Sequence, residues 1–189
     1  MKSALRKTIT VAGLTVAAMP ALAHTGGDVS GLAAGVAHPL LGMDHLLAMV
    51  AVGVWSATQP ARFAWQGPAL FVALLAAGAL AGIGGVSVPL VEPGILASVI
   101  ILGLMIMFSR VLPAAAAFVA IGGFALLHGH AHGSEAAGAL TGYMTGFMLA
   151  STALHAAGFS AGRAMAKMRF GLIGSGFAIA IGGLLLAAG

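Results

Sequence analysis

The run HPLLGMDH, residues 38–45, places two histidines and an aspartate within a chain in which only 6% of residues are charged. An aspartate in an apolar segment costs roughly 3 kcal/mol to insert, so it needs a partner or a water-filled cavity. His38 and His45 are seven residues apart and share one face of a straight helix, with Asp44 about 100° round from His45. Pro39 donates no backbone hydrogen bond and crowds the preceding turn, so the helix should kink or break beside His38.

Imidazole, carboxylate and carbonyl donors that converge in this way suit a borderline divalent cation such as Ni²⁺, Co²⁺ or Zn²⁺. We therefore predict metal ligands at His38, Asp44 and His45. The alternative is a network of hydrogen bonds between helices that binds no ligand.

A second polar run, LLHGHAHGSE, lies at the outer end of the fourth apolar stretch. On a helix, His128, His132 and Glu135 share a face because they are spaced i, i+4 and i+7, whereas His130 points elsewhere. We predict that this face offers further metal ligands to the aqueous phase outside. The alternative is a solvated, histidine-rich loop that binds metal without specificity.

Three single residues add to these clusters. Glu92 lies between Pro89 and Pro93, and a residue before proline is restricted to extended conformations, so its carboxylate is presented in a fixed direction. An ordinary surface carboxylate is the alternative. His155 is either an exit-side ligand or a packing residue, and packing is favoured. His24 could chelate metal through its amine and ring if it is the mature N-terminus.

The elements that must position these residues are membrane-spanning helices. The chain has 189 residues, of which 60% are hydrophobic, and its mean hydropathy is +1.09. A soluble domain could hardly sustain this composition. Six apolar stretches each approach the ~20 residues that cross a bilayer as a helix. The sequence thus predicts an all-α integral membrane protein with a six-helix transmembrane bundle over about 30–57, 64–85, 94–112, 114–131, 136–158 and 170–188.

The first residues indicate a secretory signal peptide. Lys2, Arg6 and Lys7 precede a short apolar run that ends in an A-x-A site, which predicts cleavage after Ala23 and a transporter domain over 24–189. An uncleaved seventh helix is the alternative. Cleavage lowers the formal net charge from +4 to +1, so the basic isoelectric point is no argument for nucleic acid. The absence of cysteine excludes disulfides and thiolate metal sites.

The remaining basic residues predict the topology. They follow the first, third and fifth stretches, at Arg62, Arg110, Arg163, Lys167 and Arg169. All therefore fall on one side, which the positive-inside rule makes cytoplasmic. We expect a bacterial-type inner membrane protein with both termini outside. Three helices in each half mean that any internal duplication would give 3+3 inverted halves, as in many secondary transporters.

The runs HPLLGMDH and HGHAHGSE, together with LHAAGFSAG in the fifth stretch, resemble the HupE/UreJ family of nickel and cobalt permeases. The resemblance covers nearly the whole mature chain. It implies passive or gradient-driven uptake of Ni²⁺ or Co²⁺ for nickel enzymes such as hydrogenase or urease, with no tightly bound cofactor. By this likeness the main metal site is His38, Asp44 and His45, with Glu92, His132 and Glu135 as further important positions. Phe71 matches another functional position, for which packing is the alternative.

Two other classes of function remain open from the residues alone. An intramembrane zinc hydrolase could use three histidines and an aspartate to hold Zn²⁺ and a water of lowered pKa. A haem protein would need two histidines facing each other across two helices. The sequence has no G-x-x-x-x-G-K-[ST] loop, so this chain cannot itself hydrolyse ATP, and the expected partners are the metal ion and the lipid bilayer.

Overall fold

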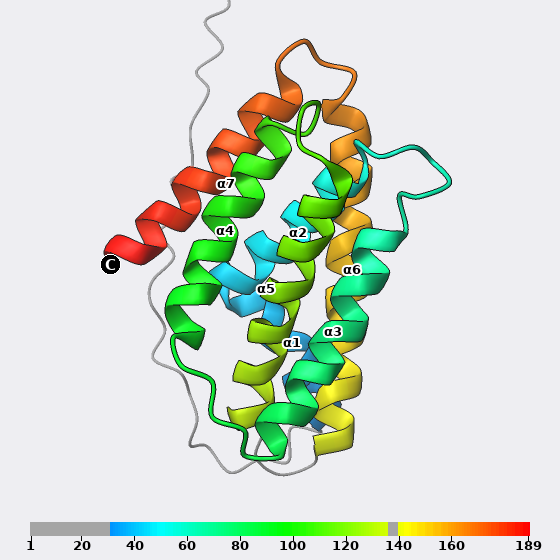
Figure 1. Ribbon diagram of the computed structural model, residues 1–189. Coiled ribbons are helices and arrows are strands. Elements are labelled where there is room, and N and C mark those ends of the chain that lie inside the picture. The colour runs from blue at the N-terminus through cyan, green and yellow to red at the C-terminus, as the bar shows by residue number, and fades with distance from the viewer. Residues whose placement is uncertain (1–30, 136–139) are drawn as a thin grey trace, which may run out of the picture.

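The computed structural model describes residues 31–135 and 140–189, and every regular element in these ranges is a helix (Figure 1). The predicted leader, its cleavage site and His24 lie outside the described residues. The helices are α1 (Gly31–Leu41), α2 (Met43–Ser56), α3 (Gln66–Ile83), α4 (Val91–Met107), α5 (Ala114–Glu135), α6 (Leu140–Met165) and α7 (Gly171–Ala188). The all-α prediction is confirmed for this part of the chain.

The first predicted stretch is broken into two helices. α1 and α2 meet at an angle of 78°, and the break falls at Gly42 rather than at Pro39, which lies inside α1. Gly42 is extended, with φ −78° and ψ 107°, yet its N–H still bonds the His38 carbonyl at 3.0 Å. The expected break is therefore present, but three residues later than Pro39. His38 and His45 face each other across a bend instead of stacking on one straight helix.

Each of the other predicted stretches contains a helix. By length and composition, α3, α5 and α7 can cross a membrane within the described residues, and the α1–α2 pair could make one further, bent span. α4 is apolar but has only 17 residues, and the 26-residue α6 carries several Ser, Thr and Gly residues. The chain is thus a helical membrane protein, and six crossings remain a prediction.

The helices pack in three main groups. α3 lies against α5, α4 against α7, and α6 against both α1 and α2. In a comparison of the two halves of the chain, α5 corresponds to α1–α2, α6 to α3 and α7 to α4. The packing of α3 against α5 then corresponds to the packing of α6 against α1 and α2, and the packing of α4 against α7 corresponds to itself. Two related halves of inverted topology would give this pattern.

Close backbone contact at two of these interfaces depends on glycine. A Cβ added at Gly129 would overlap the Leu75 carbonyl of α3, and one at Gly146 of α6 would overlap the Leu32 carbonyl of α1. Small residues let membrane helices approach until their backbones touch. The close packing of α5 against α3, and of α6 against α1, brings the histidines of these helices into contact with the other side chains of the core.

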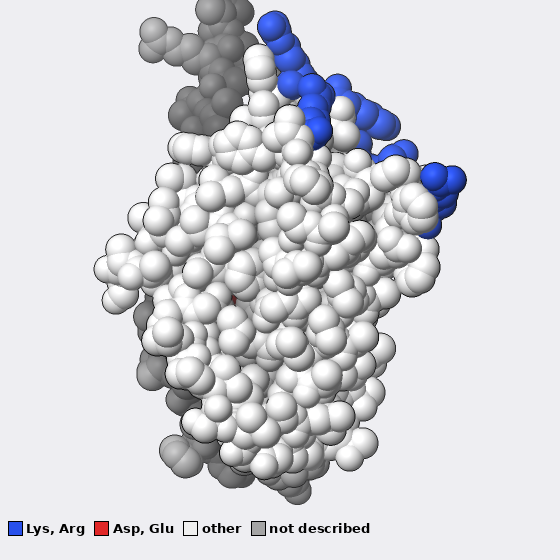
Figure 2. Space-filling model, viewed as in Figure 1, with Lys and Arg blue, Asp and Glu red and all other residues white. Residues whose placement is uncertain are grey.

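All the basic side chains of the described residues gather at one end of the bundle (Figure 2). This end carries the α2–α3, α4–α5 and α6–α7 connections (Figure 1). We call it the basic end, and it is defined by Arg62, Arg110, Arg163, Lys167 and Arg169. The prediction that these five residues lie on the same side is confirmed, because they lie at the same end of the bundle. Glu92, at the start of α4, lies at the opposite end (Figure 1).

Candidate metal centre

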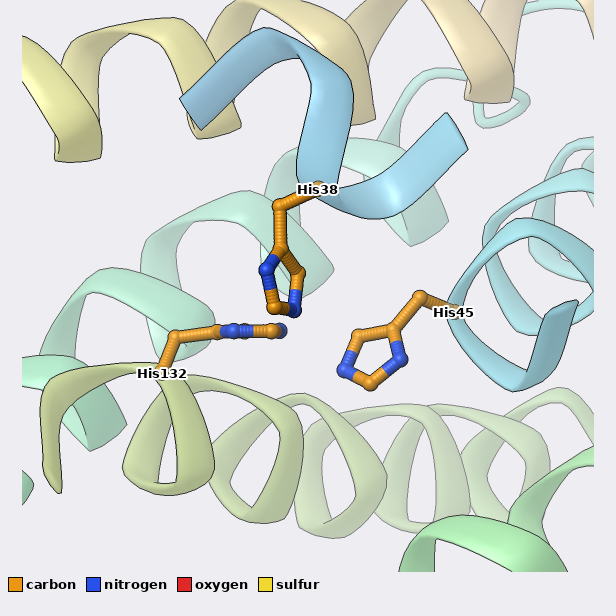
Figure 3. Close-up of side chains that lie close together, drawn as sticks. All are labelled: His38, His45 and His132. Atoms are coloured by element: carbon orange, nitrogen blue, oxygen red, sulfur yellow. The ribbon is translucent and has the colours of Figure 1, made fainter. Parts of the chain in front are cut away.

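Three histidines from three helices meet inside the bundle (Figure 3). His38 comes from α1, His45 from α2 and His132 from α5, and each offers one ring nitrogen within 4.8 Å of the others. His45 and His132 are buried, at 7% and 1% exposure, and His38 is half-buried. In the part of the chain that the structure describes, this is the one group of three such ligands. We refer to it as the three-histidine centre.

The ring contacts show how tightly the three-histidine centre is assembled. The ring centroid of His132 lies 4.5 Å from that of His38 and 4.4 Å from that of His45. The Nε2 of His45 and both ring nitrogens of His132 are buried without a hydrogen-bond partner. Buried polar atoms are nearly always partnered in native structures, so these nitrogens need an explanation. A metal ion bound between the rings would supply one.

Asp44 enters the site through His45. The Asp44 Oδ1 accepts hydrogen bonds from the backbone N–H of His45 at 2.8 Å and from its ring Nδ1 at 2.7 Å. Nδ1 therefore carries the proton, and the lone pair of Nε2 is free for a metal. A carboxylate that holds a ligating imidazole in this way fixes its tautomer and raises its basicity. The structure thus places Asp44 behind a ligand of the three-histidine centre rather than within the group itself.

His128 extends the centre by one helical turn of α5. Its ring centroid is 4.9 Å from that of His45, and the side chain is fully buried. Nδ1 lies 2.8 Å from the Phe124 carbonyl and donates to it, which leaves Nε2 as a free acceptor without a partner. As the sequence predicted, His128 and His132 share one face of α5, and His130 points away from it.

Two buried phenylalanines flank the histidines. The Phe147 ring of α6 lies 4.1 Å from His132, and the Phe71 ring of α3 lies 5.7 Å from His128. Both side chains have no exposed area. Sequence reasoning selected Phe71 through the family resemblance alone and missed Phe147. A signal was present, because Phe147, Ser151 and His155 are spaced by four residues and line one buried face of α6.

The donor set fits a borderline divalent cation. Imidazole nitrogens bind such ions at about 2.1 Å, so two ligands of one ion are at most about 4.2 Å apart. Donor atoms spread over 4.8 Å need only a small inward shift to share an ion. Neutral imidazoles suit zinc, copper, iron and nickel alike, so these ligands define a class of metals rather than one element.

Other predicted site residues lie apart from the centre. Glu92 is exposed at the far end of the bundle. The Nε2 of His130 donates to the Val86 carbonyl at 2.6 Å, which ties α5 to the α3–α4 connection. His155 is buried on α6 and contacts Phe71 rather than the three-histidine centre. Glu135 ends α5, and its side chain lies outside what the structure describes.

The expectation that HGHAHGSE faces the outside water is wrong for its histidines. α5 continues through this run to Glu135, and His128, His130 and His132 are 0%, 8% and 1% exposed. The packing of α3 against Gly129 and Gly133 covers this part of α5. The His132 side chain is consequently buried inside the bundle and is not part of a solvated mouth.

Comparison with known proteins places the chain among related sequences. The family model described as HupE / UreJ protein matches residues 12–186. Protein HupE of Rhizobium leguminosarum bv. viciae is 40% identical over 184 residues, which cover 96% of this chain and 94% of that protein. No solved structure matches the chain significantly.

Proposed function

This chain belongs to the HupE/UreJ family, and we propose that it is a membrane permease for divalent nickel, with cobalt as the other candidate ion. The observation that carries the proposal is the three-histidine centre, in which His38, His45 and His132 each offer a ring nitrogen within 4.8 Å of the others. The Nε2 of His45 and both ring nitrogens of His132 are buried and have no hydrogen-bond partner. The family is associated with nickel and cobalt transport for hydrogenase and urease, and supply of metal to such enzymes is the role that we propose here.

The donor set suits transport better than permanent storage. A transport site must replace the hydration shell of the ion and still release it. Three neutral imidazoles contribute no charge, so the negative charge that offsets the cation must come from Asp44 behind His45. Attraction between these charges is much stronger inside the bundle than in water. In such a site the carboxylate contacts a ligating histidine rather than the ion itself. The site can then bind a divalent ion without the closed set of ligands that surrounds a structural metal.

The orientation in the membrane follows from the basic end. Positively charged residues near helix ends favour the cytoplasmic side, so we place Arg62, Arg110 and the basic residues between α6 and α7 inside the cell. The ion would enter from the opposite end, where α1 begins and α5 ends (Figure 1). The bacterial inner membrane, with both termini outside, is the location that this orientation supports.

The rival functions find less support. Three imidazoles and a carboxylate also resemble the ligands of a catalytic zinc ion, but membership of a transporter family favours a permease over a hydrolase. A haem between two histidines needs room for its macrocycle. The rings of His38, His45 and His132 contact one another directly, so a macrocycle would fit only after the bundle opened.

Uptake by the purified protein in proteoliposomes tests the proposal. Initial rates for Ni²⁺, Co²⁺, Zn²⁺ and Cu²⁺ should show saturable uptake of Ni²⁺ or Co²⁺ above that of protein-free vesicles. A variant with His38, His45 and His132 all changed to Ala provides the control for leakage. Equal rates for the wild type and this triple variant would refute the proposal. Zinc retained in stoichiometric amounts after purification would favour the hydrolase instead.

A further inference from the structure

A fifth buried histidine lies on the other side of Phe71 from the three-histidine centre. His155 of α6 is 1% exposed, and neither ring nitrogen has a hydrogen-bond partner. The Ser151 carbonyl, one turn earlier on α6, is a backbone acceptor near the ring. Even a bond to this carbonyl, like that of His128 to Phe124, would occupy one nitrogen only. His155 therefore keeps at least one buried, unused metal donor, and a buried polar group without a partner costs free energy.

A continuous row of rings connects His155 to the three-histidine centre. The His45 ring contacts His128 at 4.9 Å, and His128 contacts Phe71 at 5.7 Å. The Phe71 ring also contacts the ring of His155, at 5.0 Å. Phe71 is fully buried, so its apolar ring separates the last histidine of the centre from the isolated one. An ion that travels along this row must pass Phe71.

A cavity opens beside His155 toward the basic end. It has a volume of about 420 Å³ and is lined by residues of the α2–α3 connection, the start of α3 and α6, among them Ala61, Trp65, His155 and Ser160. Arg62, one of the residues that define the basic end, lies in the same connection. Most of its lining is apolar, and among its lining residues His155 is the one with a metal-binding ring nitrogen. His155 is thus positioned between Phe71 and a space near the proposed cytoplasmic side.

We propose that His155 is a second, transient site for a borderline divalent cation, which receives the ion from His128 when the Phe71 ring moves aside and releases it toward the basic end. The inference rests on the proposed function for the direction of travel, but the binding of metal at His155 can be tested without transport. One imidazole with water in the other positions holds an ion weakly, and weak binding is what release requires.

The first test separates transport from binding at the three-histidine centre. In proteoliposomes, His155→Ala should lower initial Ni²⁺ uptake by about tenfold, the lower end of what the loss of a supporting group at a metal site costs. Equilibrium Ni²⁺ binding by the purified variant should remain as in the wild type. His155→Phe, which refills the space, should fail equally, whereas His155→Cys, which restores a donor, should recover part of the rate. Ser175→Ala, on α7 and outside this row, is the control and should keep the wild-type rate, because the Ser175 hydroxyl bonds only the Leu172 carbonyl of its own helix.

The second test measures metal binding at this position directly. The chain has no cysteine, so His155→Cys and Ser160→Cys each carry a single thiol in the cavity. Ni²⁺ should slow the reaction of a maleimide with the thiol in His155→Cys and leave that in Ser160→Cys unchanged. Wild-type uptake by His155→Ala, or equal reaction rates with and without Ni²⁺, would overturn the inference. If Ni²⁺ slowed the maleimide reaction of His155→Cys but the wild-type protein transported no metal, the proposed function would be refuted and the second metal site would be supported.

Discussion

The carboxylate of Asp44 accepts a hydrogen bond from the ring Nδ1 of its own sequence neighbour His45, at 2.7 Å. The pair sits in the first turn of α2, immediately after the break at Gly42. A Cβ at Gly42 would lie 3.2 Å from both the Asp44 Oδ1 and the His45 Nδ1. The break, the missing side chain and the hydrogen bond together direct the Nε2 of His45 toward the three-histidine centre.

Asp44→Asn should weaken Ni²⁺ binding by about 10- to 100-fold, the usual cost of losing the group that supports a ligating histidine. The amide keeps the shape and one acceptor oxygen but removes the negative charge that offsets the cation. Uptake should fall with binding, while thermal unfolding in detergent stays near that of the wild type. Titration of purified protein with Ni²⁺ measures the effect, and wild-type affinity in Asp44→Asn would remove the carboxylate from the mechanism.

His132→Ala should abolish uptake even at saturating external metal, because His132 is a buried member of the centre and excess metal cannot replace an interior ligand. His130→Ala is the matched control on the same helix. Its ring bonds the Val86 carbonyl rather than facing the centre, so Ni²⁺ affinity should change little. Concentration curves of initial uptake distinguish the two, and recovery of His132→Ala at high Ni²⁺ would contradict its place in the centre.

Glu135→Gln should behave differently from His132→Ala. As a carboxylate at the outer end of α5, Glu135 is predicted to raise the local cation concentration at the entrance, an electrostatic contribution that excess metal can replace. Uptake by Glu135→Gln should therefore be reduced at low external Ni²⁺ and normal at saturation. A loss that persists at saturation would assign Glu135 to the obligatory pathway.

Acidification should weaken metal binding. Protons compete with the metal for the imidazole lone pairs of the centre, so Ni²⁺ affinity should fall as the pH decreases on both sides of the vesicle. An inward proton gradient should not accelerate uptake if transport is facilitated diffusion. Initial rates measured first at equal pH and then with only the outside acidified check both statements. Faster uptake under the gradient would show that proton flow drives transport.

Gly129→Ala should destabilise the protein, because its Cβ would overlap the Leu75 carbonyl of α3. Overpacking of this kind costs about 1–3 kcal/mol. Gly123→Ala is the control on the same helix, since nothing lies within 4 Å of a Cβ there. A lower midpoint of thermal unfolding in detergent for Gly129→Ala, with Gly123→Ala unchanged, is the expected result. Equal midpoints of thermal unfolding for the two variants would show that α3 and α5 accommodate the extra methyl group at Gly129 without loss of stability.

Local patterns in the sequence predicted the helices and the faces of α5, because apolar length and the i, i+4 spacing of His128 and His132 depend on nearby residues alone. The position of the break was not predictable in the same way. Pro39 is the local signal for a break, yet α1 runs on through it, and the chain turns at Gly42. The crowding around Asp44 and His45 at Gly42 becomes apparent only once the side chains are placed.

The burial of the second histidine run also depends on distant residues. Its glycines and histidines have the composition of a solvated loop, which is why exposure to water was expected. α3, more than forty residues earlier in the sequence, covers the run through backbone contacts at Gly129 and Gly133. The meeting of His38 and His45 with His132 likewise joins segments far apart in the chain. Spacing within one segment carries no information on such a contact.

The glycine-lined interfaces have a mechanical consequence. At Gly129 and Gly133, where α3 meets α5, and at Gly146, where α6 meets α1, the atoms nearest to the position of a Cβ belong to the backbone of the facing helix. Each of these glycines forms a notch that a backbone carbonyl of the facing helix fills, and the neighbouring residues, which carry side chains, could not take its place. α3 and α6, which carry Phe71 and Phe147 beside the histidines, are thus held in one axial register against their neighbours. A displacement of either phenylalanine ring therefore needs less rearrangement when the side chain rotates than when its helix moves.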